Sequence, residues 1–278
     1  MNARLLPLLA ALHLLAAVAA LGWRYFADAQ PDLEDVATAT ALPLPPVPPR
    51  IAHGRDYEQC LGMLDNDPAA AAGFALGWEA VGGGDGATHC LALSRIALGH
   101  AAEGAAMLEK LATTSAAAAA ARATIYAQAS QAWLIEDESV KAYGAITMAL
   151  ALLPDDADML IDRAMNASAL DRDDDAIADL DHALRLDPGR ADALTLRATA
   201  HRQSDRLDAA AADIARALNL DPDYPEALLE RGIIRQRRGD PAGAREDWER
   251  VIDLAPDTGA ADLAEQNLAL LEAGPAPK

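Results

Sequence analysis

The sequence predicts an all-α fold, a solenoid of about six helix pairs closed by a C-terminal capping helix. Two observations carry this prediction. Four predicted helices end at a proline, and these prolines are 34 residues apart, a period typical of stacked helical repeats. Alanine, the best helix former, is abundant, whereas aromatic residues make up only 4% of the chain. We therefore expect helices that pack closely through small residues, and no large β-sheet.

Each repeat ends in a similar motif, in which proline stops the second helix because it lacks an N–H and clashes with the preceding turn. Upstream the pattern weakens, but residues 57–84 and 88–111 still predict a helix, a turn and a second helix. Residues 258–272 are expected to form the capping helix. The four motifs are ALALLP at Pro154, ALRLDP at Pro188, ALNLDP at Pro222 and VIDLAP at Pro256.

Small residues recur where the first helix (A) and the second helix (B) of each pair should cross. In this pattern the chain resembles tetratricopeptide repeat proteins, of the bacterial cell-envelope type. The resemblance covers residues 123–256 and, more weakly, 55–118, and it implies a right-handed superhelix that binds proteins. The matching residues are Ala164, Ala176 and Ala183; Ala198, Ala210 and Ala217; Gly232 and Ala244, with Val251 in place of the third small residue; and Ser130, Ala142 and Ala149 in a weaker unit.

Residues 1–29 predict a signal peptide or a membrane anchor. Residues 5–23 carry no formal charge. Arg4 precedes them, and Arg24 follows them before Asp28 begins an acidic stretch. This charge order places the N-terminus inside and the body of the protein across the membrane. The segment Ala27–Ala29 fits an A-x-A cleavage site, so cleavage and retention both stay open. The expected location is the periplasm, free or anchored to the inner membrane.

The remaining chain divides into four predicted parts. Residues 30–50 form a linker with five prolines between Pro43 and Pro49, a composition that favours an extended spacer. Degenerate helix pairs occupy 51–118, the repeats occupy 119–256, and the capping helix and tail occupy 257–278.

Composition and motifs exclude several classes of function. A net charge of −20 disfavours nucleic-acid binding, because phosphates would be repelled. No nucleotide, zinc or hydrolase motif occurs, so we expect no cofactor, no metal and no small-molecule substrate. Asp171, Asp173 and Asp175 alternate as in a calcium loop, but Ala176 and His182 replace the required glycine and glutamate. We instead expect this acidic run to form an A–B turn and to cap helix B.

Three arginines repeat at 34-residue intervals, and each precedes an aspartate by 16 residues. Both residue types are missing together in the weaker units, which indicates contact between helices A and B. Because a partly buried charge needs its partner, we expect structural ion pairs, with an anion-binding ladder as the alternative. The pairs are Arg163 with Asp179, Arg197 with Asp213, and Arg231 with Asp247.

The exposed faces of the A helices are the predicted groove for a peptide or partner protein. The stripe is apolar with acidic edges, which suits a helical or extended segment. The candidate lining residues are Gln128, Gln131 and Ile135; Asp158, Ile161 and Met165; Asp192, Thr195 and Thr199; and Glu226, Leu229 and Ile233.

Cys60 and Cys90 are the only cysteines, and both fall on predicted A helices of neighbouring units. In an exported chain an even count suggests a disulfide. His89 beside Cys90 is not expected to be catalytic, because adjacent helical residues point in different directions. The sequence thus predicts a non-catalytic interaction scaffold, exported or tethered to a membrane. A periplasmic assembly factor or chaperone-like module is the first alternative, and an enzyme with a repeat scaffold is the second.

Overall fold

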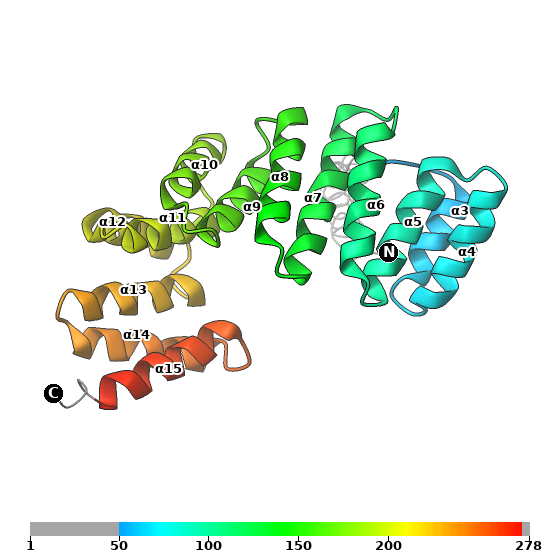
Figure 1. The fold of residues 1–278 in the computed structure, drawn as a ribbon. Coiled ribbons are helices and arrows are strands. Elements are labelled where there is room, and N and C mark those ends of the chain that lie inside the picture. Colours follow the sequence, from blue (N-terminus) through cyan, green and yellow to red (C-terminus); the bar gives the residue numbers. More distant parts are fainter. Residues whose placement is uncertain (1–49, 274–278) are drawn as a thin grey trace, which may run out of the picture. The chain divides into compact units, whose positions relative to one another are not determined.

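The computed structural model describes residues 50–273, which contain thirteen α-helices and no strand (Figure 1). This confirms the prediction of an all-α fold. The helices are α3 (Arg55–Met63), α4 (Pro68–Ala80), α5 (Gly84–Ala97), α6 (Ala101–Thr114), α7 (Ala119–Ile135), α8 (Ser139–Leu152), α9 (Ala157–Ser168), α10 (Asp173–Leu186), α11 (Ala191–Gln203), α12 (Leu207–Leu220), α13 (Pro225–Arg237), α14 (Pro241–Leu254) and α15 (Gly259–Ala273).

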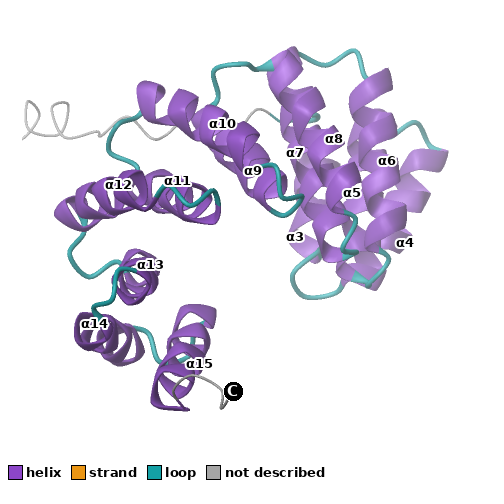
Figure 2. Ribbon diagram, turned by 60° about the vertical axis from the view of Figure 1, so that its left-hand side comes forward, coloured by secondary structure: helices purple, strands orange, loops and turns teal. Residues whose placement is uncertain are grey.

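Helices α3 to α14 form six consecutive pairs, each joined by a short turn, and α15 follows the last pair (Figure 2). Every helix packs against the next one along the chain. The A helices also contact one another from pair to pair, as α3 with α5, α9 with α11, and α11 with α13. The A helices therefore share one side of the stack, and α15 packs against both α13 and α14.

The helix crossings are filled by the small residues that the sequence pattern singled out. Ala164, Ala176, Ala198 and Ala210 are buried with at most 1% of their surface exposed. In the last repeat Gly232 faces the fully buried Trp248, and a Cβ added to the glycine would lie 2.3 Å from the indole nitrogen. Small side chains at these positions let two helix backbones approach closely.

The A–B turns of the last four pairs share one backbone feature, a single residue with left-handed φ. Asp137, Asp171 and Asp205 have φ between 56° and 59°, and Gly239 has φ of 82°. These residues are 34 apart, and aspartate is among the few non-glycine residues that adopt this conformation readily. The acidic run at 171–175 is thus a turn followed by the first turn of α10, as expected.

The expectation that this run caps α10 through a side chain was wrong. The N-cap of α10 is Arg172, and no side chain accepts a hydrogen bond at that cap. Three aspartates from Asp173 to Asp175 lie in the first helical turn, where the helix dipole favours negative charge. No cluster of metal-ligating side chains occurs within residues 50–273.

The predicted leader and most of the predicted linker lie outside the described residues. Within 50–273, no helix has the length and apolar character needed to cross a bilayer. The described part of the chain begins at Arg50 and Ile51, and Ile51 is already buried against the helices.

Candidate functional site

We call the surface of the A helices that carries the predicted lining residues the helix-A face. Five of those residues are exposed, and two of the exposed ones are large and apolar: Ile135 at 65% and Met165 at 50% exposure. Ile161, Thr195 and Leu229 are buried instead, with 5 to 8% of their surface exposed, so they offer little surface to a partner. The other exposed residues are Gln131, Asp158 and Glu226, and those of intermediate exposure are Gln128, Asp192, Thr199 and Ile233.

Arg190, which the sequence reasoning did not single out, organises the acidic edge of this face. Its guanidinium lies 2.6 Å from Oδ1 of Asp158 and 2.7 Å from Oδ2 of Asp192, bridging α9 and α11. The hydrogen bond from Arg190 lowers the pKa of Asp192. Two predicted groove carboxylates are therefore held by an internal partner.

Asp162 lies on α9 between Asp158 and Met165 and is partly buried. Burial raises its pKa, and the nearby carboxylates of Asp158 and Asp156 add to this effect, while Arg190 opposes it. The centre of the helix-A face therefore carries a carboxylate that is costly to keep ionised without a nearby cation.

The structure brings each repeated arginine together with the aspartate sixteen residues later. All three pairs have an Nη2–Oδ1 distance of 2.6 Å and a second hydrogen bond through Nε, the two-point geometry that favours arginine with carboxylate. Hydrogen bonding to Asp213 raises the pKa of Arg197. Each of these guanidinium groups already binds a carboxylate through Nε and Nη2, which disfavours the anion-ladder alternative.

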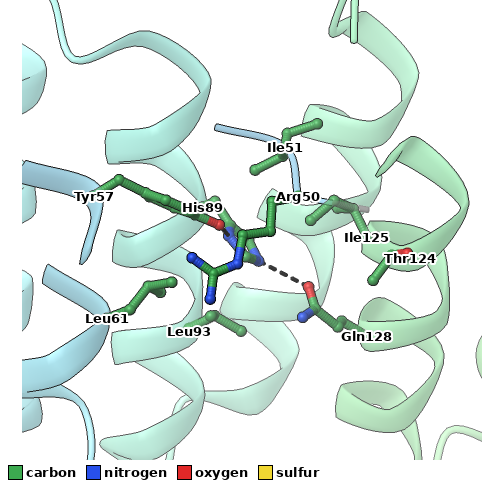
Figure 3. A pocket seen from close by; sticks show the side chains of 9 residues that line it. All are labelled: Arg50, Ile51, Tyr57, Leu61, His89, Leu93, Thr124, Ile125 and Gln128. Atoms are coloured by element: carbon green, nitrogen blue, oxygen red, sulfur yellow. Dashed lines mark hydrogen bonds between the residues drawn. The ribbon is translucent and has the colours of Figure 1, made fainter. Parts of the chain in front are cut away.

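A cavity of about 170 Å³ opens among α3, α5 and α7, three consecutive A helices (Figure 3). Its wall is mainly aliphatic, with polar groups at one side. The lining residues are Arg50, Ile51, Tyr57, Leu61, His89, Leu93, Thr124, Ile125 and Gln128.

A hydrogen-bonded chain crosses this cavity from α3 to α7. The hydroxyl of Tyr57 lies 2.6 Å from Nδ1 of His89, and Nε2 of His89 lies 2.8 Å from Oε1 of Gln128 (Figure 3). Burial lowers the pKa of His89, so the ring is neutral at pH 7. Burial also raises the pKa of Tyr57 to about 12, which keeps its hydroxyl protonated.

Cys60 on α3 and Cys90 on α5 form a disulfide, and both are fully buried. Cys90 therefore offers no thiol to the neighbouring His89, whose two ring nitrogens are already engaged. The sequence reasoning dismissed His89 as a catalytic group but did not find its partners. Only the stacking of three helices brings Tyr57 and Gln128, 32 residues before it and 39 after it, to the same ring.

Comparison with known proteins agrees with this architecture. A sequence model described as tetratricopeptide repeat matches residues 196–269. Residues 196–269 therefore carry tetratricopeptide repeats. No curated protein sequence matches the chain at a significant level.

Several solved structures share the fold of this chain. PilF of Pseudomonas aeruginosa has a TM-score of 0.58 at 12% identity, over 76% of this chain and 96% of its own. MamA, residue 41 to the end, from Desulfovibrio magneticus RS-1 has a TM-score of 0.53 at 15% identity, over 75% and 99%. YrrB, described as a TPR protein with an unusual peptide-binding site, has a TM-score of 0.50 at 18% identity, over 78% and 99%. At these identities the likeness concerns the fold, and such a fold is typical of scaffolds for protein–protein interaction.

Proposed function

We propose that this chain is a non-catalytic scaffold whose helix-A face binds a segment of a partner protein. The observation that carries the proposal is the surface of α7 and α9. There, Met165 is 50% exposed on the same helix as Asp158 and Asp162, which precede it by seven and three residues, and Ile135 at the C-terminal end of α7 is 65% exposed. Exposed apolar side chains with charged neighbours are what a helix or strand of a partner requires for docking.

The charge of this surface indicates the chemistry of the partner. Asp162 is partly buried, and burial together with the nearby carboxylates of Asp158 and Asp156 raises its pKa. A lysine or arginine of the partner would supply a compensating charge, and an apolar side chain beside it would cover Met165. The proposed ligand of α7 and α9 is therefore a segment that combines basic and apolar residues. YrrB, which shares the fold, is described as binding peptide, the same class of ligand.

We further propose that the scaffold lies outside the cytoplasm, either exported or tethered by residues 1–29. Arg4 before the apolar segment and the acidic residues after it support this orientation. The disulfide between Cys60 and Cys90 is consistent with an oxidising compartment. Alkaline phosphatase fused after residue 50 should be active, and a cytoplasmic reporter fused there should not; the reverse result would overturn the topology.

Two methionines offer a matched test of the docking face. Met165 on α9 and Met148 on α8 are both 50% exposed, but only Met165 belongs to an A helix. A photo-crosslinking residue placed at 165 in the native envelope should capture one partner in stoichiometric amount, and the same residue at 148 should not. Mass spectrometry of the product identifies the partner.

Met165→Glu should abolish this association, whereas Met148→Glu should leave it intact, with both variants folded by circular dichroism. Equal crosslinking at 148 and 165, or equal tolerance of both substitutions, would remove the helix-A face as the docking site. Capture of many proteins at low yield would instead favour the assembly-factor or chaperone-like alternative.

A further inference from the structure

The cavity among α3, α5 and α7 has the size of one large apolar side chain. Its volume is about 170 Å³, and Ile51, Leu61, Leu93 and Ile125 form the aliphatic part of its wall. A cavity of roughly 150 Å³ lined by such side chains is large enough to bind benzene. A leucine or phenylalanine side chain therefore fits here and would bury its surface against aliphatic groups.

The hydrogen-bonded chain through His89 fixes which end of the Gln128 amide faces the cavity. A neutral imidazole has one donor nitrogen and one acceptor nitrogen. Because Oε1 of Gln128 accepts from Nε2, Nδ1 must accept from the Tyr57 hydroxyl. The Gln128 amide nitrogen is then left on the cavity side, turned toward Leu93 (Figure 3).

Arg50 adds a positive charge at the mouth of the same cavity. Its guanidinium lies across the opening in the close view, and its side chain is 37% exposed (Figure 3). Its one ion-pair partner among the described residues is Glu58, itself 55% exposed, through a single guanidinium nitrogen. An exposed pair of this kind is weak, so a carboxylate of a ligand can replace Glu58.

The free polar groups at the cavity mouth are thus hydrogen-bond donors: the amide of Gln128 and the guanidinium of Arg50. They stand beside an aliphatic wall in a chain whose surface is otherwise strongly acidic. We propose that this cavity binds an apolar side chain of a partner polypeptide that is followed directly by an acidic residue. The apolar side chain enters the cavity, and the carboxylate binds Arg50 and Gln128.

This inference deepens the proposed partner-binding function and rests on it, but it concerns α3, α5 and α7 only. It also predicts a different ligand chemistry from that of Met165 and Asp162, where the partner should be basic. One partner could carry both the apolar–acidic motif for the cavity and the basic–apolar motif for the surface around Met165, separated by the distance between these two surfaces. The two proposals are tested with different probes, so one can fail while the other stands.

The experiment measures binding of three fluorescein-labelled hexapeptides to the full chain by fluorescence polarisation. The first, Gly-Ser-Leu-Glu-Ser-Gly-amide with the fluorescein on its N-terminal amine, carries the apolar and acidic pair. Replacing its glutamate with glutamine should weaken binding about fivefold, the effect of one partly exposed charge-assisted hydrogen bond. Replacing its leucine with alanine should weaken binding at least about tenfold, because the cavity is then left unfilled.

Two charge variants of the chain distinguish recognition from a merely structural role of the rim. Arg50→Gln should remove the preference for glutamate, so that the glutamate and glutamine peptides bind equally. Glu58→Gln should release Arg50 and strengthen binding of the glutamate peptide about threefold, because its competitor is gone. Glu79→Gln on α4, an exposed acid away from the cavity, controls for the general loss of negative charge and should change nothing.

A third variant fills the cavity. Thr124 is partly buried, and its hydroxyl donates only to the carbonyl of Ala120 in its own helix, so Thr124→Trp should be accommodated in the open space. It should abolish the dependence on the peptide leucine while the urea midpoint is retained. If this variant fails to fold, the comparison of Arg50→Gln with Glu58→Gln still decides whether the cavity binds an apolar side chain followed by an acidic residue.

Three results would overturn the proposal. The first is equal affinity of the native chain for all three peptides, or no binding of any. The second is a glutamate preference that survives Arg50→Gln. The third is a leucine preference that survives in a folded Thr124→Trp protein.

Discussion

Replacing Arg197 with alanine should lower the free energy of unfolding by about 3 kcal/mol, because it leaves a buried carboxylate without its main partner. Arg197 Nη2 and Nε contact both oxygens of Asp213, whose side chain is only 7% exposed. The nearest remaining cations are Arg216 at 3.6 Å and, when protonated, His201 at 4.0 Å. Neither lies close enough to replace the two-point contact.

Two other arginines of the chain allow the size of this effect to be compared with the burial and the remaining partners of the carboxylate. Arg231→Ala should cost less, about 1 to 2 kcal/mol, because Arg235 stays 2.9 Å from the other oxygen of Asp247. Arg206 pairs with Asp174 on the surface, where the two side chains are 47% and 82% exposed. Arg206→Ala should therefore change stability by no more than about 0.5 kcal/mol, which makes it the control for removing an arginine.

The assay is a double-mutant cycle on urea unfolding midpoints with Arg197→Leu, Asp213→Leu and the double variant. The double variant should recover much of the loss, because the weaker units hold apolar residues at these positions, Ala129 with Ala145 for example. The slope of the unfolding transition must be compared in each variant, since stacked repeats can unfold in parts.

A coupling free energy near zero, with an unchanged midpoint for Arg197→Ala, would refute this reasoning. The pair would then contribute nothing to the packing of α11 on α12, and Arg197 would become a candidate binding residue. A loss in Arg206→Ala equal to that in Arg197→Ala would also contradict it, because burial could no longer explain the difference.

Three further predictions concern other parts of the chain. Replacing Cys60 and Cys90 with serine should lower the free energy of unfolding by about 3.6 kcal/mol for a 30-residue interval on the loop-entropy model. Amide hydrogen exchange should become faster mainly in α3, and unchanged exchange there would contradict the prediction. Burial lowers the pKa of His89, so the unfolded chain binds more protons than the folded chain. The free energy of unfolding should therefore fall as the pH drops below about 6.5. The decrease in urea midpoint between pH 7.5 and 5.5 should be smaller in His89→Gln than in the native chain. Gly232→Ala should destabilise the fold by about 1 to 3 kcal/mol, because the added Cβ would overlap a buried tryptophan. Gly144→Ala in α8, where the added Cβ meets open space, should stabilise the fold by about 0.5 to 1 kcal/mol. Thermal unfolding of both variants tests this difference.

Period and residue size alone predicted which segments become helices and how they pair. Local chemistry is sufficient for this, because proline ends a helix and small residues allow a close crossing wherever they recur. Aspartate in the A–B turns was also readable, since its tolerance of left-handed φ is a property of the residue. The capping role expected of the acidic run at 171–175 was wrong, because a cap depends on which residue has the non-helical backbone, and here that residue is Arg172.

The candidate sites show where sequence reasoning ends. The repeated spacing of Arg197 and Asp213 made their contact predictable, because every repeat places the two residues in the same relation. Exposure was not predictable in the same way: Met165 is exposed and Ile161 is buried, although both lie on α9, because the neighbouring helices decide which part of the helix surface is covered.

The sequence by itself determined the helices, their pairing, and the residues that recur from repeat to repeat. The tertiary structure alone decided what the non-repeating residues do. Tyr57, His89 and Gln128 share no period and no motif, yet three stacked helices bring them into one hydrogen-bonded chain. A cavity is the space left between side chains of different helices, so its position depends on how those helices pack, which no local pattern in the sequence encodes.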